Sequence, residues 1–104
     1  MMAEYRTVAK LGDLKPGDCK MIEVGDEAVA LYNVDGTIYA SHNQCIHMGG
    51  NLGEGFLDGK FIICPLHAWK FDVTNGECDF DPDQKIQILP VKIVGEDIQV
   101  EIDF

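Results

Sequence analysis

The sequence predicts an all-β protein: an antiparallel sandwich or small open barrel with a loop-rich subdomain inserted between its strands. Short apolar or alternating segments recur along the chain, as expected for strands. Turns rich in Gly, Asp and Asn separate these segments. With 104 residues the chain has room for little more than one domain, so we expect residues 1–104 to form a single domain.

The first part of the chain predicts four strands and one helical turn. Asp35-Gly36 is a strong hairpin signal, because both positions of the turn that suits a two-residue hairpin require a positive φ. Gly25-Asp26 marks a second turn, and Leu11–Leu14 has room for one helical turn. We expect an antiparallel meander of the strands 5–9, 19–24, 27–33 and 37–40.

The central part of the chain has a different composition. Ser41–Gly59 holds many glycines and is predicted to be loop. Two short strands, 61–63 and 69–73, flank the segment Cys64–His67. Thr74-Asn75-Gly76 follows as another turn. We therefore expect the loop-rich subdomain to run from about residue 41 to about residue 79.

The C-terminal part predicts three further strands. Lys85–Leu89 alternates with a period of two, and Pro90 ends this segment. Residues 91–94 form the next expected strand, and Gly95-Glu96-Asp97 turns the chain into Ile98–Ile102. The clean alternation of the last segment indicates one buried face and one solvent face.

The chain is acidic, with 18 acidic and 8 basic residues and a formal net charge of −10. This charge argues against nucleic-acid binding and against docking on an anionic membrane. No apolar run reaches the roughly 18 residues that span a bilayer, and residues 1–10 do not resemble a secretion signal. We expect a soluble, cytoplasmic protein. The acidic stretch Glu77–Asp83 either flanks a docking face or is a solvated loop.

Two short motifs carry the chemistry: Cys45-Ile46-His47 and Cys64-Pro65-Leu66-His67. Each motif offers one thiolate and one imidazole. This mixed arrangement suits a cluster of two irons, in which both loops give sulfur to one iron and nitrogen to the other. It is the ligand set of a Rieske [2Fe–2S] centre. Cys45 and Cys64 would bind one iron, and His47 and His67 the other.

A zinc-stabilised binding module that uses the same four residues is the main alternative. Structural zinc motifs usually pair like ligands, as Cys-x₂₋₄-Cys and His-x₃₋₅-His, whereas both motifs here are mixed. His42 lies outside the motif spacing and is predicted to be a surface or structural residue. Cys19 and Cys78 are predicted to be free thiols that pack as small apolar residues, with a disulfide or an additional ligand role as the alternative.

The two motifs, followed by Phe71-Asp72-Val73-Thr74-Asn75-Gly76, resemble the soluble Rieske-type ferredoxins of bacterial ring-hydroxylating dioxygenases and related multicomponent monooxygenases. The resemblance covers essentially the whole chain. It implies one Rieske [2Fe–2S] cluster per chain, held by Cys45, His47, Cys64 and His67. It also implies one-electron transfer from an NAD(P)H-dependent flavoprotein reductase to a terminal oxygenase, with no catalysis by the carrier itself. A small Rieske subunit of a nitrite-reductase-type system is the alternative within redox biology.

The chain departs from the membrane-bound Rieske proteins of cytochrome bc complexes at two points. Those proteins carry an additional cysteine in each cluster loop, where this chain has Met48-Gly49-Gly50 and Leu66. They also place a serine and a tyrosine near the cluster, at positions that match Trp69 and Phe71 here. Fewer hydrogen bonds to sulfur predict a reduction potential at the low end of the Rieske range, about −150 mV.

Trp69 and the central glycines each allow two interpretations. Trp69 either packs over the cluster or at a docking surface, or it is an ordinary aromatic that covers the core. Glycines of the first loop either bring backbone N–H groups close to cluster sulfurs or serve loop geometry alone. These are Gly49, Gly50, Gly53 and Gly55.

Overall fold

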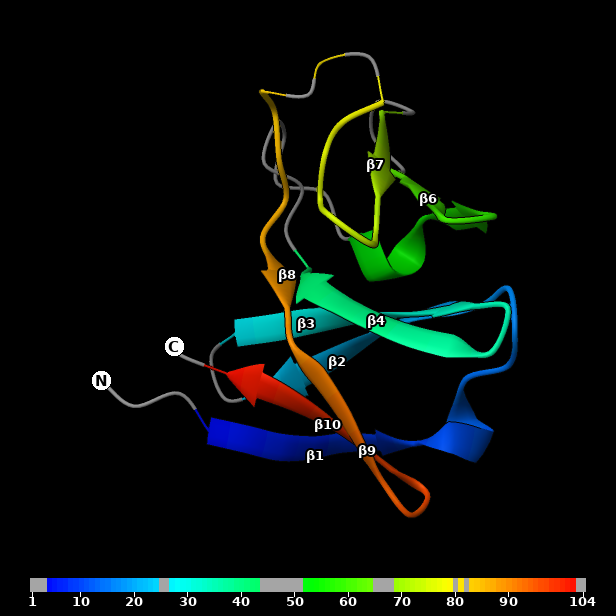
Figure 1. Cartoon of the computed structure of the whole chain (residues 1–104), viewed down its shortest axis with the longest axis vertical. Helices are drawn as coiled ribbons and strands as arrows, with labels where there is room; N and C mark the ends of the chain where they lie inside the picture. The colour runs from blue at the N-terminus through cyan, green and yellow to red at the C-terminus, as the bar shows by residue number, and fades with distance from the viewer. Residues whose placement is uncertain are drawn as a thin grey trace.

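Strands dominate the computed structural model, which describes residues 4–24, 27–43, 52–64, 69–79, 81 and 83–102. The described residues form ten strands and two short 3₁₀ turns (Figure 1). The predicted all-β class is therefore confirmed. The elements are β1 (Glu4–Lys10), η1 (Leu11–Asp13), β2 (Cys19–Val24), β3 (Glu27–Val34), β4 (Thr37–His42), η2 (Leu52–Glu54), β5 (Phe56–Asp58), β6 (Phe61–Ile63), β7 (Lys70–Asp72), β8 (Ile88–Leu89), β9 (Val91–Val94) and β10 (Asp97–Ile102).

The first sheet joins the two ends of the described chain, in the order β1-β10-β9. All its pairings are antiparallel. On β10, Ile98, Val100 and Ile102 are buried, while the residues between them are half-exposed, which confirms the predicted alternation. The pairing of β1 with β10 corrects one expectation: the first strand does not belong to the meander that follows it.

The second sheet, in the order β2-β3-β4-β8, contains the predicted hairpin. Asp35 has a φ of 57° and Gly36 a φ of 95°, as a type I′ turn requires. β8 is shorter than the predicted strand 85–89, because only Ile88 and Leu89 pair with β4. Lys85 instead forms an isolated bridge with Glu77.

The third sheet, β5-β6-β7, lies between β4 and β8 in sequence and forms the upper part of the molecule in Figure 1. Gly59, with a φ of 62°, opens the two-residue turn between β5 and β6. The prediction that 41–59 is loop was wrong in part. Ser41 and His42 end β4, and η2 and β5 occupy 52–54 and 56–58. The many glycines in this segment indicated a loop, so the prediction missed these short elements.

The β2-β3-β4-β8 sheet separates two apolar cores. Ala30 and Tyr32 of β3 pack into the core shared with β6 and β7, whereas Val29 and Leu31 pack into the core shared with β10. All four residues are 0% exposed. β3 is thus buried on both faces, which explains its continuous apolar run. Neither 3₁₀ turn of the described chain is long enough to cross a membrane.

Candidate metal centre

Cys64 is the one predicted ligand among the described residues. It follows β6 directly, and its backbone N–H donates to the carbonyl of Trp69 at 2.8 Å. This bond closes the loop that connects β6 to β7, as the sequence predicts. Cys64 is 1% exposed and belongs to the apolar core formed with β6 and β7. Cys45, His47 and His67 lie outside the described residues.

The segment that carries Cys45 and His47 is closed in a similar way. It begins after Asn43 and ends before Leu52. The Leu52 N–H donates to the Asn43 carbonyl at 2.7 Å, and the Gly53 N–H donates to Asn43 Oδ1 at 2.8 Å. We call this group, Asn43 with Leu52 and Gly53, the loop neck. Sequence reasoning missed Asn43, although asparagine side chains often bond nearby backbone groups where a strand ends.

The structure brings the ends of the two loops to the same core. Leu52, which ends the first loop, and Cys64, which begins the second, pack in one cluster of buried residues. Gly55 lies against the carbonyl of Ile63, so closely that a side-chain carbon there would clash with it. Segments distant in sequence are thus placed side by side, as a cluster shared by both motifs requires.

A tight turn follows β7, at the opposite end of the β6–β7 hairpin from Cys64. Asp72 is 8% exposed, and its Oδ1 accepts from the Thr74 N–H at 2.9 Å and from the Thr74 hydroxyl at 2.5 Å. Lys60 Nζ lies 3.1 Å from Asp72 Oδ2. Burial alone would raise the pKa of Asp72, but these hydrogen bonds and the Lys60 ammonium outweigh it and hold the pKa below its usual value. Gly76 completes the turn with a φ of 85°. The Phe-Asp-x-x-x-Gly pattern therefore encodes this turn.

The aromatic residues after the second loop differ in burial. Phe71 is 0% exposed in the core, and Trp69 packs partly buried against that core. Their ring centroids are 6.4 Å apart with an interplanar angle of 41°. This packing favours the interpretation of Trp69 as an aromatic that covers the core. Neither side chain carries a hydroxyl, which maintains the prediction of a low potential.

The remaining cysteines are free thiols, as predicted. Cys78 is buried in the same core as Cys64, and Cys19 is half-buried on β2. Cys19 Sγ lies 3.3 Å from the Gly55 carbonyl oxygen and 3.5 Å from that of Gly53. Burial raises the pKa of the Cys19 thiol, and Asp18 raises it further, so this group stays protonated at neutral pH.

His42 and the glycines have backbone roles. His42, at the end of β4, pairs with Val29 and donates its N–H to the Gln87 carbonyl at 3.0 Å, in keeping with a structural residue. A side-chain carbon on Gly53 would lie 2.6 Å from the Met21 backbone nitrogen. Close backbone approach therefore explains glycine at position 53. Gly49 and Gly50 lie outside the described residues.

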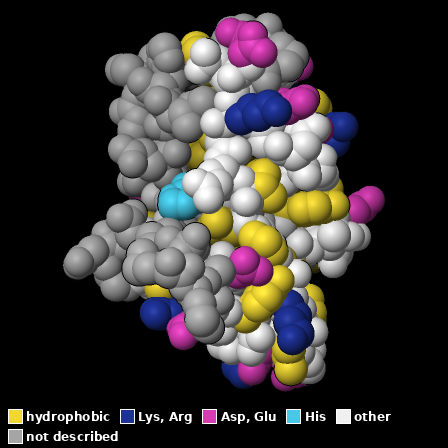
Figure 2. All heavy atoms as spheres, turned by 60° about the vertical axis from the view of Figure 1, so that its left-hand side comes forward, with side chains coloured by type: hydrophobic (Ala, Val, Ile, Leu, Met, Phe, Trp, Pro, Cys, Tyr) yellow, Lys and Arg dark blue, Asp and Glu magenta, His cyan; other side chains and the backbone are white. Residues whose placement is uncertain are grey.

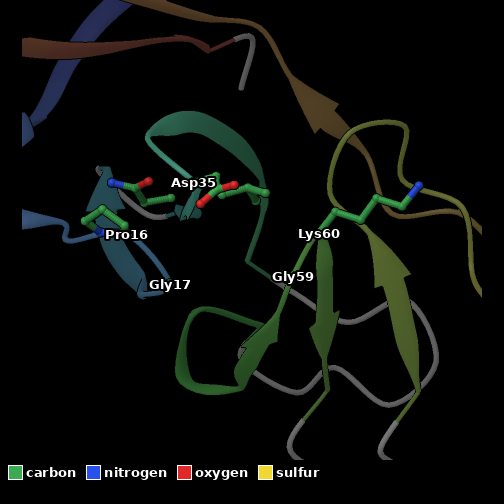
Figure 3. Close-up of a pocket in the computed structure, with 7 residues that line it drawn as sticks. Pro16, Gly17, Asp35, Gly59 and Lys60 are labelled. Carbon is green, nitrogen blue, oxygen red and sulfur yellow. The ribbon is translucent and has the colours of Figure 1, made fainter.

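A pocket of about 380 Å³ lies away from Cys64, where three turns meet. Pro16, Asp35 and Lys60 line it, and Lys60 belongs to the turn at the opposite end of β6 from Cys64. In Figure 3 the Lys60 side chain extends away from Pro16 and Asp35, so the charged groups do not converge on one point. This pocket is not part of the metal centre.

The described donor fits an iron–sulfur cluster by its chemistry. Cys64 is a free, buried cysteine beside apolar side chains, and thiolates are the soft ligands that iron–sulfur clusters need. Figure 2 shows a face on which lysine and arginine side chains stand apart and beside acidic ones, mixed with hydrophobic side chains. Because charged and apolar groups share most protein surfaces, this mixture does not by itself mark a binding site.

Known proteins resemble this chain over almost its full length. The family model described as the Rieske [2Fe-2S] domain matches residues 4–94. The ferredoxin component of the naphthalene 1,2-dioxygenase system of Pseudomonas putida is 38% identical and covers 99% of this chain and 98% of its own length.

Solved structures agree. Sphingomonas yanoikuyae B1 ferredoxin has a TM-score of 0.87 and 28% identity, covering 96% of this chain and 100% of its own. The ferredoxin in a complex with the oxygenase of carbazole 1,9a-dioxygenase has a TM-score of 0.85 and 29% identity, covering 93% and 92%. A structure from Mycobacterium tuberculosis described as an NADH-dependent nitrite reductase small subunit shares the fold, with a TM-score of 0.86 at 22% identity, covering 100% and 99%.

These findings decide between the two metals that the motifs allowed. The cofactor is a Rieske [2Fe–2S] cluster, as predicted, and the zinc-stabilised alternative has no support. From the fold, the two closed loops and the full-length match, the chain belongs to the Rieske [2Fe–2S] domain family.

Proposed function

We propose that this protein carries single electrons from an NAD(P)H-dependent flavoprotein reductase to a terminal oxygenase and performs no catalysis of its own. The main observation behind this proposal is that a ferredoxin component of a dioxygenase system matches 99% of this chain. The ferredoxin–oxygenase complex of a relative that is 29% identical supports the oxygenase as a partner. The likeness to a nitrite reductase small subunit extends to the fold alone, so the oxygenase pathway is preferred.

The proposed ligands are Cys45 and Cys64 on one iron and His47 and His67 on the other. When bound, the cluster supplies a reversible one-electron acceptor. The protein supplies the apolar packing around Cys64 and the hydrogen bonds at the ends of the ligand loops. The Cys64 side chain lies in an apolar core that excludes water, and backbone hydrogen bonds close both ligand loops. Packing and hydrogen bonds of this kind orient the ligands of a metal centre.

We propose that the outward side of β5 belongs to the docking surface. Glu54, Phe56 and Asp58 are exposed, while Gly55 and Leu57 between them are half-buried. Phe56 is 74% exposed and pairs with Ile63, the residue before Cys64. An aromatic group flanked by acids fits a partner surface with an apolar recess and a basic rim. The chain's net charge of −10 would steer such a partner toward this acidic protein.

We further propose that residues 1–104 form one Rieske domain, with a cluster subdomain at about 41–79. The insertion of the β5-β6-β7 sheet between β4 and β8 supports this division. A cytoplasmic location remains a prediction from the sequence.

Reconstitution with purified partners tests the proposal. The holoprotein is mixed with a flavoprotein reductase and NADH, and then with an oxidised ring-hydroxylating oxygenase, while the cluster absorbance is followed by stopped flow. We expect reduction only when the reductase is present and reoxidation when the oxygenase is added. Phe56→Ser should slow reoxidation, whereas Ile93→Ser, at a residue that is 43% exposed on the distant β9, should not. Reoxidation by a nitrite reductase but not by any oxygenase would instead support the alternative pathway.

A further inference from the structure

The loop neck joins the start and the end of the segment that carries Cys45 and His47. One residue, Asn43, makes both closing contacts: its carbonyl accepts from the Leu52 N–H, and its Oδ1 accepts from the Gly53 N–H. The Asn43 N–H also donates to the Ala28 carbonyl at 3.2 Å, which fixes Asn43 to β3. Asn43 therefore connects the end of the loop to the central sheet.

These contacts are buried, so solvent cannot replace them. Asn43 is 5% exposed, and Leu52 and Gly53 are buried. A buried N–H that loses its acceptor keeps its full desolvation cost, whereas an exposed one would bond to water. Loss of the Asn43 side chain would leave the Gly53 N–H unpaired inside the protein.

The other side of η2 is fixed independently of Asn43. Gly53 lies against the Met21 backbone, where even a methyl group has no room. The Cys19 thiol lies within 3.5 Å of the Gly53 carbonyl oxygen. η2 is therefore held on β2, and Asn43 sets the position of β4 and the loop start relative to it.

We propose that Asn43 is a positioning residue of the cluster: through the loop neck it holds the segment with Cys45 and His47 in the geometry that retains the metal. The inference rests on the proposed ligand set. Asn43 acts through the loop and is not itself a ligand. The Asn43 amide is thus required for cluster retention beyond its contribution to folding stability.

Asn33 provides a matched control. It is also a buried asparagine, 6% exposed, and its Oδ1 also accepts from a glycine N–H, that of Gly36 at 2.7 Å. Its Nδ2 donates to the Leu14 carbonyl at 2.9 Å. Asn33 lies at the β3–β4 turn, at the opposite end of β4 from Asn43. Removing the Asn33 side chain breaks two hydrogen bonds, although water can reach the exposed Gly36 N–H, and it leaves the loop neck intact.

The experiment compares Asn43→Ala, Asn43→Asp and Asn33→Ala as holoproteins. Cluster loss to a chelator is followed by absorbance in native buffer, the reduced cluster is recorded by electron paramagnetic resonance, and unfolding is followed in urea. We expect Asn43→Ala to lose its cluster about tenfold faster than the wild type, a factor that corresponds to about 1.4 kcal/mol. Its resonance lines should broaden. Asn43→Asp keeps the acceptor for the Gly53 N–H and should largely restore retention.

The Asn33→Ala control separates an effect on cluster retention from an effect on folding stability alone. Asn33→Ala should lower the urea midpoint as Asn43→Ala does, yet keep the wild-type rate of cluster loss and the wild-type line shape. If Asn43→Ala assembles no cluster while Asn33→Ala does, the proposal is supported. Equal rates of cluster loss in the two alanine variants, or no rescue by Asn43→Asp, would overturn it. A Cys45→Ser variant with an unchanged cluster spectrum would instead show that the proposed ligand set is wrong.

Discussion

Replacing Asp72 by alanine should destabilise the turn that follows β7, at the end of the β6–β7 hairpin opposite Cys64. The carboxylate accepts two hydrogen bonds from Thr74 and pairs with Lys60. Its backbone carbonyl also accepts from the Gly76 N–H at 2.6 Å, a contact that the substitution leaves in place. The variant therefore isolates the contribution of the carboxylate.

The size of the effect follows from the surroundings of each contact. Hydrogen bonds to a charged group contribute about 1.5–3 kcal/mol, but Thr74 is exposed, so water replaces part of the loss. The Lys60 side chain is 53% exposed, and an ion pair at such a site contributes about 0–1 kcal/mol. We expect Asp72→Ala to reduce the free energy of unfolding by about 2 kcal/mol. Lys60→Ala should cost less than half of this.

Urea unfolding of the holoproteins, followed by circular dichroism, measures the effect as a function of pH. The pKa of Asp72 is lower in the folded protein than in the unfolded chain. Its stabilisation is therefore fully present above the unfolded pKa of about 3.9 and is lost as the pH falls through the folded pKa. The difference between wild type and variant should be constant near neutral pH and shrink below about pH 4. A difference that persists unchanged at the lowest accessible pH would refute a role for the charge.

Three other predictions concern packing, a buried hydroxyl and association. Gly53→Ala should destabilise the protein by about 1–3 kcal/mol and lower its cluster content, because the new carbon would meet the Met21 backbone. Gly12→Ala serves as the control, since nothing lies within 4 Å of a side-chain carbon at that position. Equal urea midpoints for the two variants would contradict the packing account. Tyr32→Phe removes a buried hydroxyl 2.8 Å from Ser41 Oγ and should reduce the free energy of unfolding by about 1 kcal/mol, measured in the same assay. Electron transfer to the oxygenase should slow as salt is added, since the net charge is −10, and a rate independent of ionic strength would argue against acidic docking.

Local patterns predicted most of the strands. The apolar run 28–32 marks β3, and Asp35-Gly36 marks its hairpin with β4, because turn chemistry and side-chain periodicity are encoded by neighbouring residues. β5 was missed because three residues between glycines are too few to show a period. The pairing of β1 with β10 is a contact between the chain ends, which no local pattern specifies.

Of the candidate site, the sequence predicted the position of Cys64 and the cofactor, but not the hydrogen bonds around the ligand loops. Cys64 lies at the predicted place, on a loop between two strands, and the family match confirms the cofactor. The role of Asn43 was not foreseen, because the partner of its amide, Gly53, lies beyond the loop it closes. The Phe-Asp-x-x-x-Gly pattern was visible as a signature, but its hydrogen bonds emerged only from the structure.

Electron paramagnetic resonance of the reduced holoprotein, with resolution of nitrogen hyperfine couplings, tests the central claim most directly. The account predicts two irons and two sulfides per chain, a Rieske-type signal and two coupled imidazole nitrogens. His67→Cys should remove one nitrogen coupling and lower the potential of any cluster that assembles, because a charged thiolate replaces a neutral imidazole. A spectrum without nitrogen coupling, or one that His67→Cys leaves unchanged, would contradict the proposed ligand set.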